Sequence, residues 1–205
     1  MPRHPWFAVV VTVAVILVAA LAGCATVTAG EPSAGRSDDP YRTPPSGPAT
    51  ASATTPRGAV AKDLGDPAGV CADEACAHDA LIFTVDKIQV DPTCTEPYAE
   101  PPENGHYIAV SMSIETTTDF TDDLSFMVDF SPFSFDIVGP DGVTEPGDPG
   151  MGVYMCLRSS GFLPLEGLAP ASRYVGVVVL DSRHTKGTLV LRMPGDPTGG
   201  WEWTF

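Results

Sequence analysis

The alternation of apolar and polar residues in the second half of the chain constrains its fold most. Ile108, Val110, Met112 and Ile114 alternate strictly with small or polar residues, which is the pattern of a half-buried β-strand. No segment after residue 69 combines a helical period with capping residues. The same pattern predicts further short strands, at 81–85, 88–90, 133–137, 154–157, 174–180, 188–193 and 201–205.

Signals between these strands indicate how they are arranged. A shift in the apolar rhythm at Asp86–Lys87 indicates a bulge, and Gly139–Gly142 is a strong turn signal. The run 174–180 is apolar on both faces, as expected of a central strand. Seven or more short strands separated by turns predict an all-β fold, an immunoglobulin-like antiparallel β-sandwich, over residues 69–205.

Aromatic residues are the expected centre of this core. Trp201 and Trp203 are two residues apart, so a strand places both side chains on one face. A platform for carbohydrate is the functional alternative to core packing for this pair. The predicted core or sheet-packing aromatics are Phe126, Phe130, Trp201, Trp203 and Phe205.

The segment before the predicted domain has a different composition. Residues 24–68 are mostly Ala, Thr, Ser, Gly and Pro, as in "RTPPSGPATASATTPRG", and show no apolar periodicity. Such a segment cannot bury enough apolar surface to offset the entropy lost on ordering. We therefore predict a disordered tether that holds the domain away from its point of attachment.

The first 23 residues are typical of an export signal. A short basic start precedes residues 7–21, which carry no charge. This run is shorter than the roughly 20 apolar residues of a membrane span, which is the alternative. Leu21–Cys24 resembles the lipobox of bacterial lipoprotein signal peptides. The resemblance implies cleavage after residue 23 and a diacylglyceryl group on Cys24, which would supply the two acyl chains that stable anchoring needs.

The charge of the chain restricts its partners. The formal net charge is −15, and residues 69–150 hold 17 Asp and Glu but one basic residue, Lys87. Such a surface repels nucleic acid and anionic lipid headgroups. Solubility is sufficient to explain the excess, and attraction to cations or basic partners remains open.

Four cysteines remain once Cys24 is assigned to lipid. An even number outside the cytosol favours disulfides, and four cysteines allow three pairings. The spacing does not match a thiolate metal site, which usually contains closer pairs. We favour Cys71–Cys76 as a local link and Cys94–Cys156 as a long-range one.

Several stretches resemble a known group of exported proteins. "CTEPYAEPPENGHYIAVSM", "FSPFSFDIVGPDG" and "GWEWTF" look like stretches of uncharacterised lipoproteins from high-GC Gram-positive bacteria. More broadly, residues 80–205 are similar to the secreted immunoglobulin-like family that includes an immunoprotective extracellular antigen and a domain of unknown function common in Gram-positive lipoproteins. This family has a strand with the pattern (G)xYIxV, which Gly105–Val110 matches. It also has a segment with the pattern LxPGxxxxGxVxF, which residues 168–177 match, with Ala171 where glycine is usual. The resemblance implies a surface-exposed, non-catalytic domain.

Residues that could carry catalysis are few. Asp181, Ser182 and His184 lie close together in the sequence. Neighbours along a strand end point in different directions, however, and closeness in sequence is not triad geometry. No GxSxG or SxxK motif occurs in the chain. We therefore predict no catalytic residue and no enzymatic activity.

Two kinds of segment could bind a cation. His106 with Glu100 and Glu103 could bind a metal, although an exposed loop is the simpler interpretation. The acidic loop "TTTDFTDD" is a better candidate for weak calcium binding, although it lacks the spacing of a defined calcium loop. No other cofactor is expected. The candidate calcium ligands are Asp119, Asp122 and Asp123, and a second acidic turn holds Asp141, Glu145 and Asp148.

These observations together predict a lipoprotein of the cell envelope. The membrane would be its partner through acylated Cys24, and its extracellular β-sandwich would bind an unknown envelope protein or glycan. The alternative is an enzyme, or an accessory subunit, of cell-wall metabolism. A solute-binding transport component is a third possibility, although the domain is small for a two-lobed clamshell.

Overall fold

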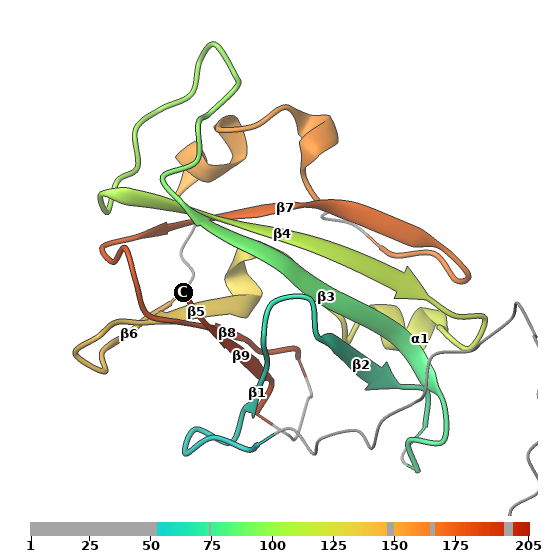
Figure 1. The fold of residues 1–205 in the computed structure, drawn as a ribbon. Helices are drawn as coiled ribbons and strands as arrows, with labels where there is room; N and C mark the ends of the chain where they lie inside the picture. The colour runs from blue at the N-terminus through green and yellow to red at the C-terminus, as the bar shows by residue number, and fades with distance from the viewer. Residues whose placement is uncertain (1–52, 74, 147–149, 165–166, 195–198) are drawn as a thin grey trace, which may run out of the picture. The chain divides into compact units, whose positions relative to one another are not determined.

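The protein folds around two β-sheets in the part that the structure describes. In this computed structural model the sheets have the strand orders β1-β9-β8-β5-β6 and β2-β3-β4-β7 (Figure 1). The predicted signal peptide and the predicted anchor, Cys24, lie outside the described residues. No described helix is long and apolar enough to cross a membrane. The described residues are 53–73, 75–146, 150–164, 167–194 and 199–205.

The four-stranded sheet is antiparallel throughout. It contains β2 (Pro67–Cys71), β3 (Asp79–Val90), β4 (His106–Thr116) and β7 (Arg173–Ser182). The clearest strand of the sequence is the inner strand β4, in which burial alternates as predicted from Val110 onward, whereas residues 107–110 are all buried. The register of β3 against β4 shifts between Val85 and Lys87, which confirms the predicted bulge.

The five-stranded sheet is built mostly from late segments of the chain. It contains β5 (Phe135–Val138), β6 (Thr144–Pro146), β8 (Thr188–Leu191), β9 (Trp201–Thr204) and β1 (Val60–Ala61). Four of these strands pair antiparallel, and β1 alone joins β9 in parallel. Apolar side chains from both sheets form one buried cluster. The predicted all-β sandwich is therefore confirmed.

Aromatic rings occupy the centre of this cluster. Phe83 of β3 is 1% exposed and makes edge-to-face contacts with Phe130 and Trp201, with ring centroids 5.2 and 5.0 Å apart. Trp203 lies 6.4 Å from the same ring. Since Trp201 and Trp203 are buried, they serve the core, and the alternative of a carbohydrate platform on this pair is wrong.

Three predictions about local structure are wrong. Phe126 is 83% exposed, because it follows the four-residue helix α1 (Asp122–Ser125) on the surface. Residues 154–157 form no strand, since the 3₁₀ helix η2 (Met151–Met155) covers most of them. The strand β7 is at the edge of its sheet. Both of its faces are nevertheless apolar, because one face packs in the main core and the other packs against η2 and irregular segments.

The folded region begins earlier than predicted, within residues 24–68. Ala59 is fully buried, and the N–H of Val60 donates to the carbonyl of Gly200 at 2.8 Å. Arg57 reaches the buried carboxylate of Glu202 with two hydrogen bonds, of 3.0 and 3.1 Å. The sequence did not reveal these contacts, because backbone hydrogen bonds and an ion pair require no periodic apolar residues. The folded domain therefore already includes residue 53 and does not begin at residue 69.

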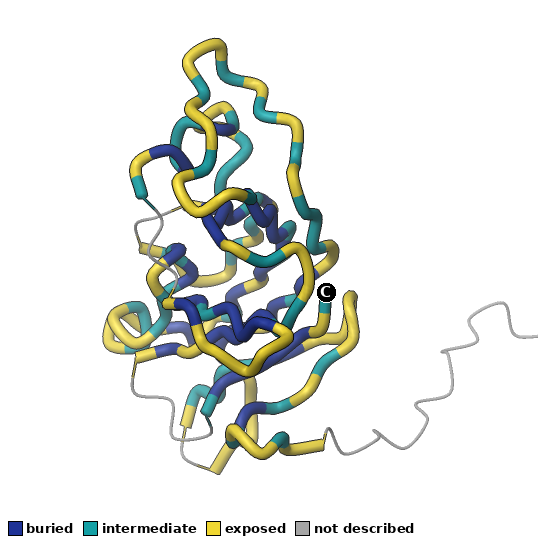
Figure 2. Tube along the Cα trace, turned by 90° about the vertical axis from the view of Figure 1, so that its left-hand side faces the viewer, coloured by how far each residue is buried: buried dark blue, intermediate teal, exposed yellow. Residues whose placement is uncertain are grey.

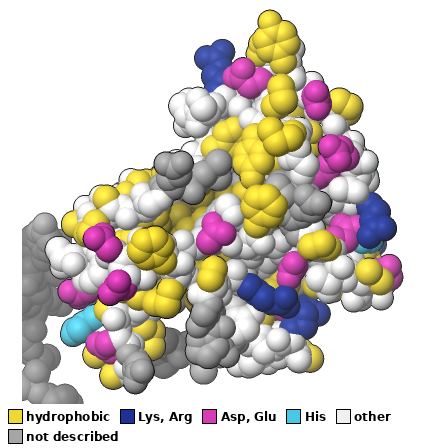
Figure 3. Space-filling model, turned by 180° about the vertical axis from the view of Figure 1, so that it is seen from behind, with side chains coloured by type: hydrophobic (Ala, Val, Ile, Leu, Met, Phe, Trp, Pro, Cys, Tyr) yellow, Lys and Arg dark blue, Asp and Glu magenta, His cyan; other side chains and the backbone are white. Residues whose placement is uncertain are grey.

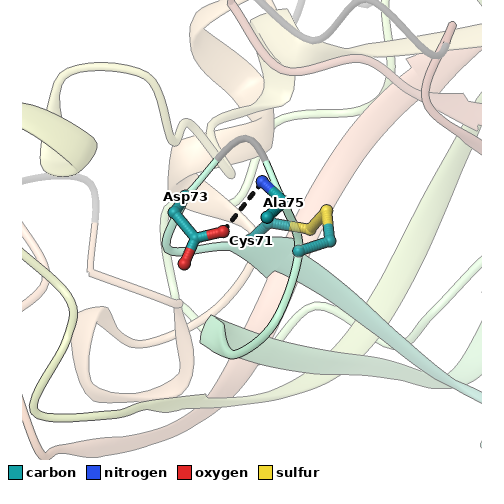
Figure 4. Close-up of a disulfide and its surroundings, with 4 residues drawn as sticks. Cys71, Asp73 and Ala75 are labelled. Carbon is teal, nitrogen blue, oxygen red and sulfur yellow. Dashed lines mark hydrogen bonds between the residues drawn. A yellow bond between two sulfur atoms is a disulfide. The ribbon is translucent and has the colours of Figure 1, made fainter.

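The structure joins the four described cysteines in the favoured pairing. Cys71–Cys76 closes a short loop after β2, in which Asp73 accepts a hydrogen bond from the N–H of Ala75 at 2.8 Å (Figure 4). Cys94–Cys156 links the long loop between β3 and β4 to the end of η2, 62 positions later in the sequence. Figure 2 shows that this long loop is mostly half-buried or exposed, in contrast to the buried strands.

Candidate binding cleft

The three residues that could have formed a catalytic triad do not form one. Ser182 is fully buried, and its hydroxyl donates to Glu145 at 2.8 Å. The same hydroxyl accepts from the backbone N–H of His184, and the structure gives no hydrogen bond between this hydroxyl and the imidazole ring. Asp181 instead accepts from two backbone N–H groups of the loop before β4, at 2.6 and 3.0 Å. These side chains serve the structure of the strand end.

Glu145, which the sequence placed in the second acidic turn, is the centre of this cluster. The residue is 7% exposed, and its carboxylate accepts hydrogen bonds from Ser182 and Arg183. Nε2 of His184 lies 3.6 Å from the same carboxylate. Burial alone would raise the pKa of Glu145. The hydrogen bonds from Arg183 and Ser182 and the proximity of His184 outweigh burial, and the pKa is lowered from its ordinary value of 4.5.

This lowered pKa makes a prediction about acid stability. A carboxyl group with a folded-state pKa below its unfolded value stabilises the protein above about pH 4.5, and the contribution is lost as the pH falls through the folded value. We expect Glu145→Gln to lower the free energy of unfolding by about 2 kcal/mol at pH 7, through loss of charged hydrogen bonds. Urea unfolding between pH 3 and 7 should show a smaller difference at the acid end. An equal difference at every pH would contradict this.

His106 has a different partner from the predicted ones. Its Nδ1 lies 3.0 Å from both carboxylate oxygens of Asp91. Asp91 follows β3 directly, and β4 begins at His106, so the pair closes the neck of the β3–β4 loop. This contact ties the two strand ends together and replaces the suggested grouping of His106 with Glu100 and Glu103.

The acidic loop contributes a helix cap. Thr121 caps α1, and its hydroxyl accepts from the N–H of Leu124 at 3.5 Å. Asp122 and Asp123 occupy the first turn of α1 and are exposed, as is Asp119 before it. Among the described residues, no three His, Cys, Asp or Glu side chains gather in a way that could hold a metal. Calcium binding at this loop remains a prediction.

A cleft lies where the Cys94–Cys156 disulfide joins two segments. One wall is the β3–β4 loop, and the other is η2 with the following 3₁₀ helix η3 (Ser159–Gly161). Backbone pairing reinforces the disulfide, since the N–H of Thr95 donates to the carbonyl of Cys156 at 2.7 Å. The cleft has a volume of about 470 Å³. Its lining residues are Glu96, Tyr98, Tyr154, Met155, Leu157, Arg158, Ser159 and Ser160.

The cleft combines aromatic rings with a loose ion pair. Tyr98 is 79% exposed, whereas Tyr154 is half-buried. Burial raises the pKa of the Tyr154 hydroxyl, and the negative charge of Asp129 adds to the shift, so this hydroxyl stays protonated at neutral pH. Glu96 and Arg158 face each other across the two walls with 3.9 Å between their charged atoms. That distance is too long for a direct hydrogen bond.

The floor beneath the cleft is supported by β7. Phe162 forms a parallel bridge with Val177, and the N–H of Leu163 donates to the carbonyl of Val177 at 3.2 Å. A side chain on Gly176 would bring a Cβ within 2.6 Å of the backbone nitrogen of Leu163, so only glycine allows this approach. Buried Val153 and Cys156 pack with Val179 in a second small core. Tyr154 and Leu157, which line the cleft, pack against this small core.

The surrounding surface carries exposed apolar groups. Figure 3 shows one face of the molecule, where hydrophobic side chains form a band that rises from the middle toward the top, with separate charged side chains beside it. Phe133, Met151 and Val175 are 69%, 71% and 67% exposed. They belong to η1 (Pro132–Ser134), η2 and β7, and both η1 and η2 contact β7.

Sequence reasoning missed Tyr98, Tyr154 and Arg158 as possible site residues. The signal that could have found them is the cysteine pairing. Joining Cys94 to Cys156 brings their neighbours together, and a tyrosine lies within four residues of each cysteine. The expected strand at 154–157 hid this, because it assigned Tyr154 to a sheet and not to the wall of a cleft.

Comparison with known proteins identifies no relative from which a function could be taken. No protein-family model and no curated protein matches the chain. A crystal structure of a secreted protein from Mycobacterium tuberculosis, MPT63, is similar over 72% of this chain and 98% of that chain, with 9% identity and a TM-score of 0.41. A likeness this distant carries no functional argument, and the family resemblance noted from the sequence remains an interpretation.

Proposed function

We propose that this protein is a lipid-anchored lipoprotein on the outer face of the cell membrane, and that its β-sandwich is a non-catalytic binding module. The observation that carries the binding role is the 79% exposure of Tyr98 at the edge of a cleft held by a disulfide. An aromatic side chain held in the open on a cross-linked support offers contact area at small entropic cost.

The two disulfides support the extracellular location. Disulfides persist in oxidising compartments and are rare in the cytosol. The export signal and the lipobox-like Leu21–Cys24 agree with this location. The acidic surface favours a domain held off the anionic membrane face over one lying on it.

The competing role is an enzyme, or an accessory subunit, of cell-wall metabolism. In the described residues, the one serine grouped with a histidine and a carboxylate is fully buried and donates to the carboxylate. Because this hydroxyl is buried, the arrangement offers no accessible nucleophile, although Glu145 lies within hydrogen-bond reach of it. We therefore favour binding over catalysis.

Retention by cell envelopes tests the binding role. We expect the full chain, purified in detergent, to sediment with an isolated, delipidated envelope fraction of the source bacterium, because its own acyl chains would retain it in any fraction that contains membrane. Tyr98→Ala should weaken this retention by about tenfold or more, as truncation of a central aromatic contact does. Phe126→Ala is the matched control, because Phe126 is an equally exposed aromatic that does not line the cleft. Equal retention of both variants and the wild type would rule out the cleft as the binding site.

A further inference from the structure

We propose that the cleft binds a neutral oligosaccharide, an inference that rests on the proposed binding function and specifies its ligand. Most of the residues that line the cleft carry polar side chains. Two tyrosines and two serines supply four hydroxyl groups, and Glu96 and Arg158 supply one acceptor and one donor group. Among the described residues, none of these six side chains has a hydrogen-bond partner. Six polar side chains thus line one cleft without hydrogen bonds to other described protein groups, so a ligand can bind them without breaking contacts within the protein.

The apolar part of the cleft suits the same ligand. A sugar ring has an apolar C–H face and a rim of hydroxyls, so it needs a flat apolar surface together with donors and acceptors. A tyrosine offers both, since its ring is apolar and its hydroxyl is a polar tip. Met155 and Leu157 line the cleft between the polar groups and supply further apolar contact.

The electrostatics favour a neutral ligand over an anionic one. Arg158 is the one cation lining the cleft, and it faces Glu96 at 3.9 Å, so the pair has no net charge. Residues 69–150, which include the β3–β4 wall of the cleft but also much of both sheets, hold 17 acids and one lysine. A phosphate- or sulfate-bearing polymer would be repelled by this field.

The size of the cleft favours a small ligand over a folded protein. Its volume of about 470 Å³ falls in the range of roughly 300–1,000 Å³ that is usual for small-ligand sites. A stable protein interface would need about 800 Å² on each partner, which exceeds what a cleft with eight lining residues provides. A protein partner is therefore the alternative that the experiment must separate.

Fluorescence anisotropy with labelled tetrasaccharides tests this inference. The full chain in detergent is titrated into neutral tetrasaccharides of glucose, mannose or N-acetylglucosamine, with a sulfated heparin tetrasaccharide as the anionic probe. We expect at least one neutral probe to bind, and the sulfated probe to bind at least tenfold more weakly. Tyr98→Ala and Arg158→Gln should each weaken binding by about tenfold, and Phe126→Ala should leave it unchanged. Both tested side chains are at least 78% exposed, so neither variant threatens folding.

Two results would overturn the inference. One is binding of the sulfated probe alone, and the other is no binding of any neutral probe at millimolar concentration. If envelope retention still depends on Tyr98 and is lost after proteinase K treatment of the envelopes, the partner is a protein. The proposed function then stands and the glycan inference fails. If retention does not depend on Tyr98 at all, the cleft is not the binding site, and both the proposed function and the glycan inference fail.

Discussion

Replacing Phe83 with alanine is expected to lower the free energy of unfolding by about 3–5 kcal/mol. Phe83 is 1% exposed and projects from β3 between the two sheets. Its ring contacts Phe130 and Trp201 edge-to-face and lies near Trp203. Alanine would remove these contacts and leave a cavity bounded by three large rings, two of which are fixed by the pairing of β9.

Urea unfolding followed by tryptophan fluorescence measures this loss, because two of the three tryptophans lie beside Phe83. Phe126→Ala is the matched control, since the same ring is removed from a position that is 83% exposed. We expect the control to change the free energy of unfolding by less than about 0.5 kcal/mol. A loss below 1 kcal/mol for Phe83→Ala would contradict the packing of the two sheets around this ring.

Removing the long-range disulfide is expected to have a similar effect. Cys94 and Cys156 are separated by 62 positions, and opening a loop of that length restores unfolded-state entropy worth about 4 kcal/mol. The folded state is also affected. Cys156 is fully buried against Val153 and Val179, and the disulfide holds the β3–β4 loop beside η2. Replacing both cysteines with serine should therefore destabilise the domain and loosen the cleft.

The short disulfide provides the control for this prediction. Cys71 and Cys76 are separated by five positions, and Cys76 is exposed. The same entropy argument gives about 2 kcal/mol for this loop. Thermal unfolding of the two double-serine variants should rank the long-range disulfide as the more stabilising one. A larger loss on removing Cys71–Cys76 would show that the long loop remains closed without its covalent link.

Strands with one buried face were predictable from the sequence. The alternation in β4 and the bulge of β3 were recognised because burial of one face leaves a period of two, and a bulge breaks that period. The buried tryptophans of β9 were recognised for the same reason. The pairing of the strands, with β1 added in parallel to β9, depends on contacts between distant residues that no local pattern encodes.

Errors occurred where apolar residues have a role other than facing the main core. The run in β7 suggested a central strand, yet its second face packs under η2 and a loop rather than a sheet. Phe126 is apolar and lies close to Phe130 in sequence, but α1 directs it to the surface. The cleft was missed because its residues come from two segments that only the Cys94–Cys156 link brings together.

The central claim is that the protein works outside the cytosol, anchored by lipid and cross-linked by two disulfides. Both the integrity of the cleft and its access to an envelope ligand depend on this claim. Mass spectrometry of the native protein, extracted from membranes and alkylated without reduction, tests it most directly. We predict an acylated Cys24 at the amino terminus and no alkylation of the four cysteines at 71, 76, 94 and 156. An intact Met1 terminus or alkylated thiols at these positions would contradict the account.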